Sequence, residues 1–120
     1  MVAVATLTSC NYRDSYILDD VQPSISLIKP VSQNQMAGDT CFISVIYSDN
    51  RALHDVYLGL NDLSRMQKKI HYSMHFHGLS FRVDTFYITQ PGDTGKFEIQ
   101  MEASDEYSNR ITKRFNMLLQ

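Results

Sequence analysis

Three of the four histidines in this 120-residue chain lie within seven positions, in the segment KKIHYSMHFHGLSF of residues 68–81. Imidazole is a common ligand of zinc and copper, and it is also a frequent acid–base group in enzymes. Apolar and polar residues alternate through the segment, which is typical of a half-buried β-strand. Ile70, Tyr72, Met74 and Phe76 then share the buried face, and all three histidines share the solvent face.

The spacing of the histidines selects one pair among them. Same-face neighbours two residues apart on a strand are about 6.5–7 Å apart, and two imidazoles at that spacing can reach one ion. His75 and His77 therefore form a competent chelating pair for zinc or copper. His71 lies too far along the strand, so a third ligand has to come from elsewhere, with His54, Asp55 and Asp84 as candidates. Solvated imidazoles without an ion are the alternative interpretation.

Catalytic motifs do not accompany these histidines. The sequence has no nucleophile elbow, HExxH motif or glycine-rich phosphate loop, so we expect the chain not to be an enzyme. Asp49, Asp93 and Asp105 lie at predicted turns, where aspartate usually accepts backbone N–H bonds. A calcium site that uses Asp105, Glu106 and Asp49 is the alternative for the last of these turns.

Alternation with a period of two residues dominates the chain after residue 23. The alternating runs are residues 23–30, 38–49, 52–62, 69–77, 79–88, 96–105 and 110–119. We expect an all-β fold, an Ig-like antiparallel β-sandwich of about seven strands, in a single domain of residues 22–120. The alternation slips near Thr85, which predicts a bulge. Residues 61–70 predict a loop or a single helical turn.

Charge and hydropathy restrict the partners. The chain has 11 basic and 13 acidic residues and a net charge of −2, which argues against nucleic-acid binding because that function needs a basic face. No apolar stretch approaches the roughly 18–20 residues of a membrane-spanning helix.

The N-terminal segment ends in Leu7-Thr8-Ser9-Cys10 after small apolar residues, as in a bacterial lipoprotein signal. Cys10 is the predicted lipidation site, although the basic start of such a signal is missing. Residues 1–21 are then a truncated signal followed by a polar tether.

Cys41 lies in an alternating run and is expected to be a small buried hydrophobic residue. A disulfide between the two cysteines is the alternative if Cys10 carries no lipid.

Several short motifs occur in a characteristic order. They are Leu7-Thr8-Ser9-Cys10, Pro23-x-Ile25-x-Leu27, Gly38-Asp39, Ser48-Asp49-Asn50-x-x-Leu53, His75-x-His77, Gly95-x-Phe97 and Ala103-x-Asp105-x-x-x-Asn109. In this order they resemble a family of short lipoproteins of Bacteroidetes-type Gram-negative bacteria with an Ig-like domain of uncharacterised function. The resemblance covers nearly the whole chain after residue 22. It implies a secreted, surface or periplasmic sandwich whose His-x-His pair contacts a metal or another ligand.

These observations lead to one expected function and two alternatives. The expected function is a non-enzymatic, lipid-anchored binding or adhesion module, exported to the outer membrane, the cell surface or the periplasm. Its partners would be the membrane, through the anchor, and surface proteins or glycans. The first alternative is a periplasmic zinc- or copper-binding domain that uses His75, His77 and His54. The second is an accessory module for glycan uptake, in which Tyr12, Tyr16, Tyr57 and Tyr107 stack on sugars.

Overall fold

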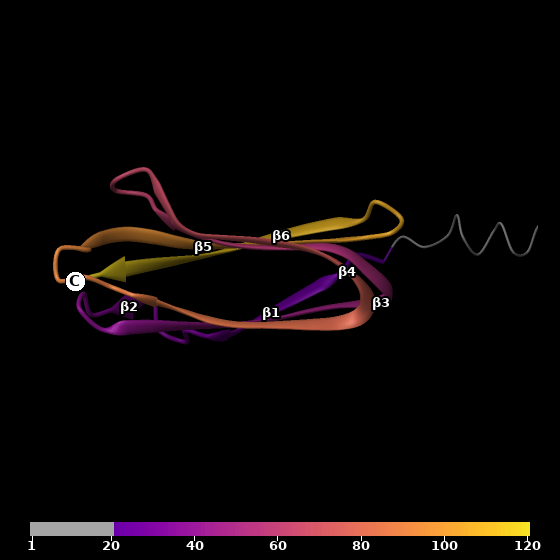
Figure 1. Cartoon of the computed structure of the whole chain (residues 1–120), viewed down its shortest axis with the longest axis horizontal. Helices are drawn as coiled ribbons and strands as arrows, with labels where there is room; N and C mark the ends of the chain where they lie inside the picture. Colours follow the sequence, from indigo (N-terminus) through magenta and orange to yellow (C-terminus); the bar gives the residue numbers. More distant parts are fainter. Residues whose placement is uncertain (1–20) are drawn as a thin grey trace, which may run out of the picture.

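The computed structural model describes residues 21–120, and every regular element in this range is a β-strand (Figure 1). The predicted all-β class is confirmed. The strands are β1 (Ser24–Lys29), β2 (Asn34–Gln35), β3 (Thr40–Asp62), β4 (Gln67–Ile88), β5 (Gly95–Asp105) and β6 (Arg110–Leu119).

The 23-residue strand β3 organises the sheet, because its two halves have different neighbours. Its first half pairs with β1 around residues 44–48, and its second half pairs with β5 over residues 53–62. β4 runs antiparallel to both halves. β6 pairs with β5, and the short β2 pairs parallel with β6. The six strands thus form one sheet in the order β1-β3-β5-β6-β2, with β4 also paired to β3.

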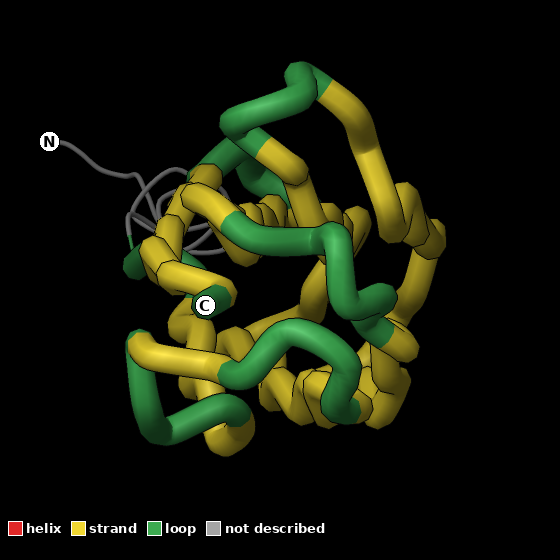
Figure 2. Tube along the Cα trace, turned by 90° about the vertical axis from the view of Figure 1, so that its left-hand side faces the viewer, coloured by secondary structure: helices red, strands yellow, loops and turns green. Residues whose placement is uncertain are grey.

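Two predicted pairs of strands are each one continuous strand in the structure. The runs 38–49 and 52–62 merge into β3, and the runs 69–77 and 79–88 merge into β4. β3 and β4 stay paired on both sides of this junction, so a single sheet curls around the interior. Figure 2, which looks along the long axis, shows the strands arranged around that interior. The division into two sheets of an Ig-like sandwich stays a prediction.

The hydrophobic core lies inside the curl and is supplied mainly by β3 and β5. Its fully buried side chains include Ile43, Val45, Leu58, Ile99 and Met101. Each such side chain contributes roughly 1.5–3 kcal/mol when it leaves water. Tyr47 is also buried, and its hydroxyl donates to the backbone oxygen of Tyr57 at 2.7 Å. Burial, with the nearby Glu102 charge, raises the pKa of Tyr47.

The predicted strand phase holds for the histidine segment. His71, His75 and His77 are exposed, while Ile70 and Tyr72 pack against the core. Phe76 also packs against the core. Met74, which was assigned to the core, is 39% exposed.

The predicted phase slip near Thr85 is wrong. Phe81, Val83 and Tyr87 keep one uninterrupted alternation and pack against the core. Phe86 and Ile88 consequently face solvent, at 55% and 57% exposure, and Leu79 is exposed as well. The Phe86 ring lies 6.3 Å from the ring of its cross-strand partner Phe42, centroid to centroid. Contact with this partner keeps an apolar pair on the outer surface.

Asp105 closes a turn as predicted, whereas Asp49 lies inside the continuous strand β3, so the turn predicted there is absent. Asp49 accepts the N–H groups of Arg51 and Ala52, and Asp105 accepts those of Tyr107 and Asn109. The segment 61–70 contains a turn at residues 63–66, in agreement with the expected loop or single turn.

Cys41 is 3% exposed, which confirms its predicted burial, and desolvation raises the pKa of its thiol. Cys10, Tyr12 and Tyr16 lie outside the described residues, so their predicted roles are untested. Between residues 21 and 120, no helix is long and apolar enough to cross a lipid bilayer.

Candidate metal centre

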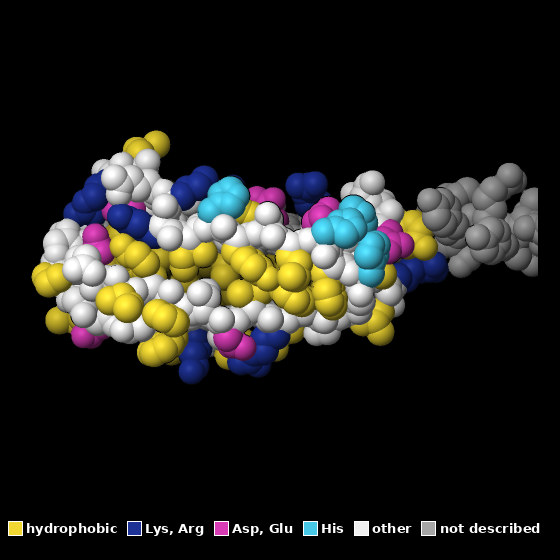
Figure 3. Space-filling view, in the orientation of Figure 1, with side chains coloured by type: hydrophobic (Ala, Val, Ile, Leu, Met, Phe, Trp, Pro, Cys, Tyr) yellow, Lys and Arg dark blue, Asp and Glu magenta, His cyan; other side chains and the backbone are white. Residues whose placement is uncertain are grey.

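Four polar side chains meet on the outer surface where β3 and β4 run together. His54 and Asp55 come from β3, and His75 and His77 come from β4; we call these four residues the histidine cluster. Asp55 and His75 are direct cross-strand partners, which places their side chains on the same face. Figure 3 shows histidine side chains gathered at the surface toward one end of the molecule.

A β-bulge explains why the adjacent residues His54 and Asp55 both join the cluster. Side chains of consecutive residues in a regular strand point to opposite faces. Leu53 pairs with Asp105 and Asp55 pairs with Ser104, so His54 is an extra residue relative to β5. Such an extra residue changes the direction in which the neighbouring side chains point. The bulge therefore brings an imidazole and a carboxylate together at consecutive positions.

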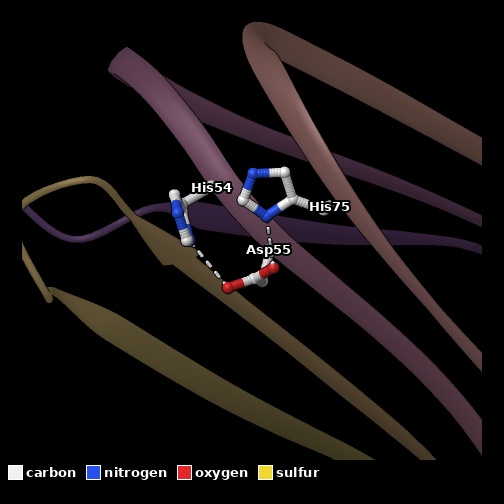
Figure 4. A group of neighbouring side chains, drawn as sticks. All are labelled: His54, Asp55 and His75. Atoms are coloured by element: carbon white, nitrogen blue, oxygen red, sulfur yellow. Dashed lines mark hydrogen bonds and ion pairs between the residues drawn. The ribbon is translucent and has the colours of Figure 1, made fainter.

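The Asp55 carboxylate bridges two imidazoles (Figure 4). His54 Nδ1 donates to Asp55 Oδ2 at 2.7 Å, and His75 Nδ1 donates to Asp55 Oδ1 at 3.1 Å. Partial desolvation raises the pKa of the Asp55 carboxyl, but the hydrogen bonds and charges of the two histidines lower it, with a net shift below its ordinary value. The carboxylate is therefore held in its ionised form.

His77 extends the cluster toward the β5–β6 turn. Its Nε2 atom lies 3.1 Å from the Nε2 atom of His75, and its Nδ1 atom lies 2.6 Å from Oε2 of Glu106. Glu106 belongs to the turn that Asp105 closes, directly after the residue that pairs with Leu53. The carboxylate of Glu106 therefore comes from a third element.

Three imidazole rings pack closely in this cluster. Ring centroids are 4.3 Å apart for His54 and His75, 4.8 Å for His75 and His77, and 5.7 Å for His54 and His77. His54, Asp55 and His75 each offer one ligand atom, and these atoms lie within 4.8 Å of one another, so the group could hold a metal ion. The side chains of the cluster are 40–57% exposed, so an ion can reach them from solvent.

Two other candidates from the sequence lie apart from the cluster. His71 packs edge-on against Tyr57, with ring centroids 5.3 Å apart. Asp84 bonds Ser44 and Arg82 instead. The hydrogen bond from Arg82, followed by that from Ser44, lowers the pKa of the Asp84 carboxyl. Of the three proposed sources of a third ligand, His54 and Asp55 are close to the pair, and Asp84 is held by other partners.

A shallow cavity of about 540 Å³ adjoins the cluster on the same face. Asp55 and His75 line one part of it, and its other lining residues include Met74, Glu102 and Arg110. Residues from four strands therefore surround a hollow with a mixed polar and apolar lining beside the imidazoles.

The sequence did not identify Glu106 as a partner of His77. The two residues are 29 positions apart, and no periodic pattern links a turn glutamate to a strand histidine. The position of Glu106 follows from the pairing of β3 with β5, which the sequence does not encode in any local signal.

A scan against protein-family models finds no match for this chain, and a search among curated proteins finds none either. The resemblance to the lipoprotein family therefore stays a prediction.

Proposed function

We propose that this chain is a non-enzymatic binding module for a transition-metal dication, zinc or copper, at the histidine cluster. The observation that carries the proposal is the convergence of ligand atoms from His54, Asp55 and His75 within 4.8 Å, with the His77 ring beside them. The side chains come from two paired strands, so the rigid sheet positions the donor atoms.

The donor types favour a transition metal. Imidazole nitrogen suits zinc and copper, whereas calcium and magnesium prefer sites built from oxygen ligands. Three imidazoles and one carboxylate therefore select against the alkaline-earth ions. The hydrophobic core is complete without an ion, so the ion would be cargo or a ligand contact and would not be required for folding.

Titration calorimetry of the wild-type chain with zinc and with copper tests the proposal. We expect saturable binding of one ion, and loss of that binding in the double variant His75→Ala/His77→Ala. His71→Ala is the matched control, because His71 lies on the same face of β4 but outside the cluster. Absence of heat with either ion at millimolar concentration would contradict the proposed function.

We also propose that the module is exported and held at the outer membrane by lipid attached to Cys10. The support is the order of residues Leu7 to Cys10, which resembles a lipoprotein signal. Expression of the full gene product with Cys10→Ala, or with a signal-peptidase inhibitor present, should move the protein from the membrane fraction to the soluble fraction. Unchanged partitioning would refute the anchor and would leave the metal proposal unaffected.

An adhesive or glycan-binding role has less support from the described tyrosines. The Arg51 guanidinium lies over the Tyr107 ring, 5.6 Å from its centroid. Lys68 lies 6.0 Å from the centroid of the Tyr57 ring, and His71 packs against that ring edge-on. Both rings already have neighbours, which reduces the surface that they offer for stacking on a sugar.

A further inference from the structure

We propose that the ion is bound by the Nε2 atoms of His75 and His77, and that Asp55 and Glu106 orient these two rings without binding the ion. This assignment rests on the proposed metal-binding function and deepens it. It differs from the set of His54, Asp55 and His75, in which the carboxylate of Asp55 would itself be a ligand.

The hydrogen bonds of the two rings leave their Nε2 atoms available for a shared ion. His75 Nδ1 lies 3.1 Å from Asp55 Oδ1 and His77 Nδ1 lies 2.6 Å from Glu106 Oε2, so each ring donates an Nδ1–H to a carboxylate oxygen. A neutral imidazole protonated at Nδ1 has a bare lone pair at Nε2. The two Nε2 atoms lie 3.1 Å apart, so one can donate to the other only if its ring carries a second proton. Without that proton, both Nε2 lone pairs are available to one metal ion.

The separation of the two nitrogens suits a shared ion. Zinc binds imidazole nitrogen at about 2.0–2.1 Å in tetrahedral geometry, so two ligand nitrogens lie about 3.3 Å apart. The observed Nε2–Nε2 separation of 3.1 Å is close to that value. The pair therefore needs only a small adjustment to bind an ion.

The two carboxylates occupy the positions of outer-shell partners. Histidine ligands of metals usually donate their second N–H to a carboxylate, a backbone carbonyl or water, which fixes the tautomer and raises the basicity of the coordinating nitrogen. Asp55 serves His75 from β3, and Glu106 serves His77 from the β5–β6 turn. The turn is itself fixed, because Asp105 accepts two of its N–H groups. Glu106 is thus a positioning residue on a rigid support.

Two protein donors leave coordination positions open. The side chains of His75 and His77 are 56% and 57% exposed, so the remaining positions of the ion face solvent. Water or an external single-atom donor would fill them. The proposal therefore includes an ion with exchangeable ligands, in contrast to the closed four-ligand sets of structural zinc sites.

Zinc affinities of variants of the full chain, measured by calorimetry with a competing chelator, test the assignment. We expect His77→Ala to abolish binding at micromolar zinc. Glu106→Gln should weaken binding by about 10–100-fold, the usual effect of losing an outer-shell carboxylate. His54→Ala should have a smaller effect than Glu106→Gln, and His71→Ala should have none. Circular dichroism confirms that each variant is folded.

Two spectroscopic readouts separate coordination from a structural effect. Long-range ¹H–¹⁵N correlation spectra of the zinc complex should show His75 and His77 protonated at Nδ1 and bound through Nε2. The visible spectrum of the cobalt(II) complex should change when azide is added, because azide replaces a bound water.

The outcomes distinguish this proposal from the proposed function. Loss of zinc binding in His54→Ala, with affinity unchanged in His77→Ala and Glu106→Gln, would overturn the assignment and keep the metal-binding function. A cobalt spectrum insensitive to azide would overturn the exchangeable position. A wild-type chain that binds no zinc or copper would overturn the function itself.

Discussion

Carboxylates in this protein act chiefly as hydrogen-bond acceptors at fixed positions. Asp93 is an example outside the candidate metal centre, since it accepts hydrogen bonds from the backbone N–H of Gln90 at 2.8 Å and from the hydroxyl of Tyr87 at 2.9 Å. The backbone hydrogen bond is the main cause that lowers the pKa of Asp93, and the Tyr87 hydroxyl lowers it further. Burial and the bond to Asp93 raise the pKa of Tyr87 to about 12.

The Asp93 interactions predict how stability depends on pH. The carboxyl titrates near 3.9 in an unfolded chain and lower in the folded chain, so its contribution is present above about pH 4 and is lost as the pH falls through the folded pKa. Asp93→Asn should therefore lower the free energy of unfolding at pH 7 and flatten its decrease between about pH 5 and pH 2. Urea unfolding at several pH values measures both effects. Asp39→Asn, at an exposed carboxylate, is the control; an equal acid dependence in Asp93→Asn and wild type would contradict the prediction.

At the scale of the element, β4 holds apolar residues on both faces: its alternation changes phase between Phe76 and Phe81, and from Phe81 to Ile88 it is uninterrupted. Phe81 packs on Phe76, with ring centroids 4.7 Å apart, and against the core. Phe86, five residues further on, faces outward onto Phe42. The two phenylalanines therefore contribute to stability in different ways despite their shared strand.

This difference predicts an ordering of mutational effects. Phe81→Ala should lower the free energy of unfolding by roughly 2–4 kcal/mol, because it removes a side chain packed on the core. Phe86→Ala should cost less than about 1 kcal/mol, the usual value of a surface cross-strand pair. Chemical denaturation of the two variants measures the difference. A larger loss of stability in Phe86→Ala than in Phe81→Ala would contradict this prediction. It would indicate that Phe86 faces the core, as the phase slip near Thr85 requires.

The sequence predicted which segments are strands better than it predicted how the strands pair. Alternation was sufficient for the all-β class and for the exposure of His75 and His77, because only one face of that segment is apolar. It failed at Phe86 and Ile88, where both faces carry apolar residues and period alone cannot select the buried one. The bulge at His54 leaves no local signal, and the contact of Glu106 depends on long-range pairing.

In the whole molecule, the candidate metal centre lies where three elements meet. β3, β4 and the β5–β6 turn each supply one or more of its side chains, and β3 connects them as the common partner of β4 and β5. An ion on His75 and His77 would draw β4 and, through Glu106, the turn toward one point. Binding would therefore stabilise the folded sheet against separation of these elements.

Thermal melting with and without zinc tests this coupling. An ion present at 100 times its dissociation constant should stabilise the folded state by about 2.7 kcal/mol, which corresponds to an increase in Tm of several degrees. The increase should be absent in His75→Ala/His77→Ala and retained in His71→Ala. An equal increase in the double variant would place the stabilising ion elsewhere.

The pairing of β4 with a single neighbour has one more consequence. Among the described strands, β4 forms ladder hydrogen bonds only with β3. The N–H and C=O groups along its other edge can therefore pair with another extended chain. Charged side chains on an edge strand commonly oppose pairing with another chain, and β4 carries Lys68, Lys69 and Arg82. A dication on His75 and His77 adds to this positive charge. We therefore expect a loaded protein to resist edge-to-edge aggregation better than the ion-free one.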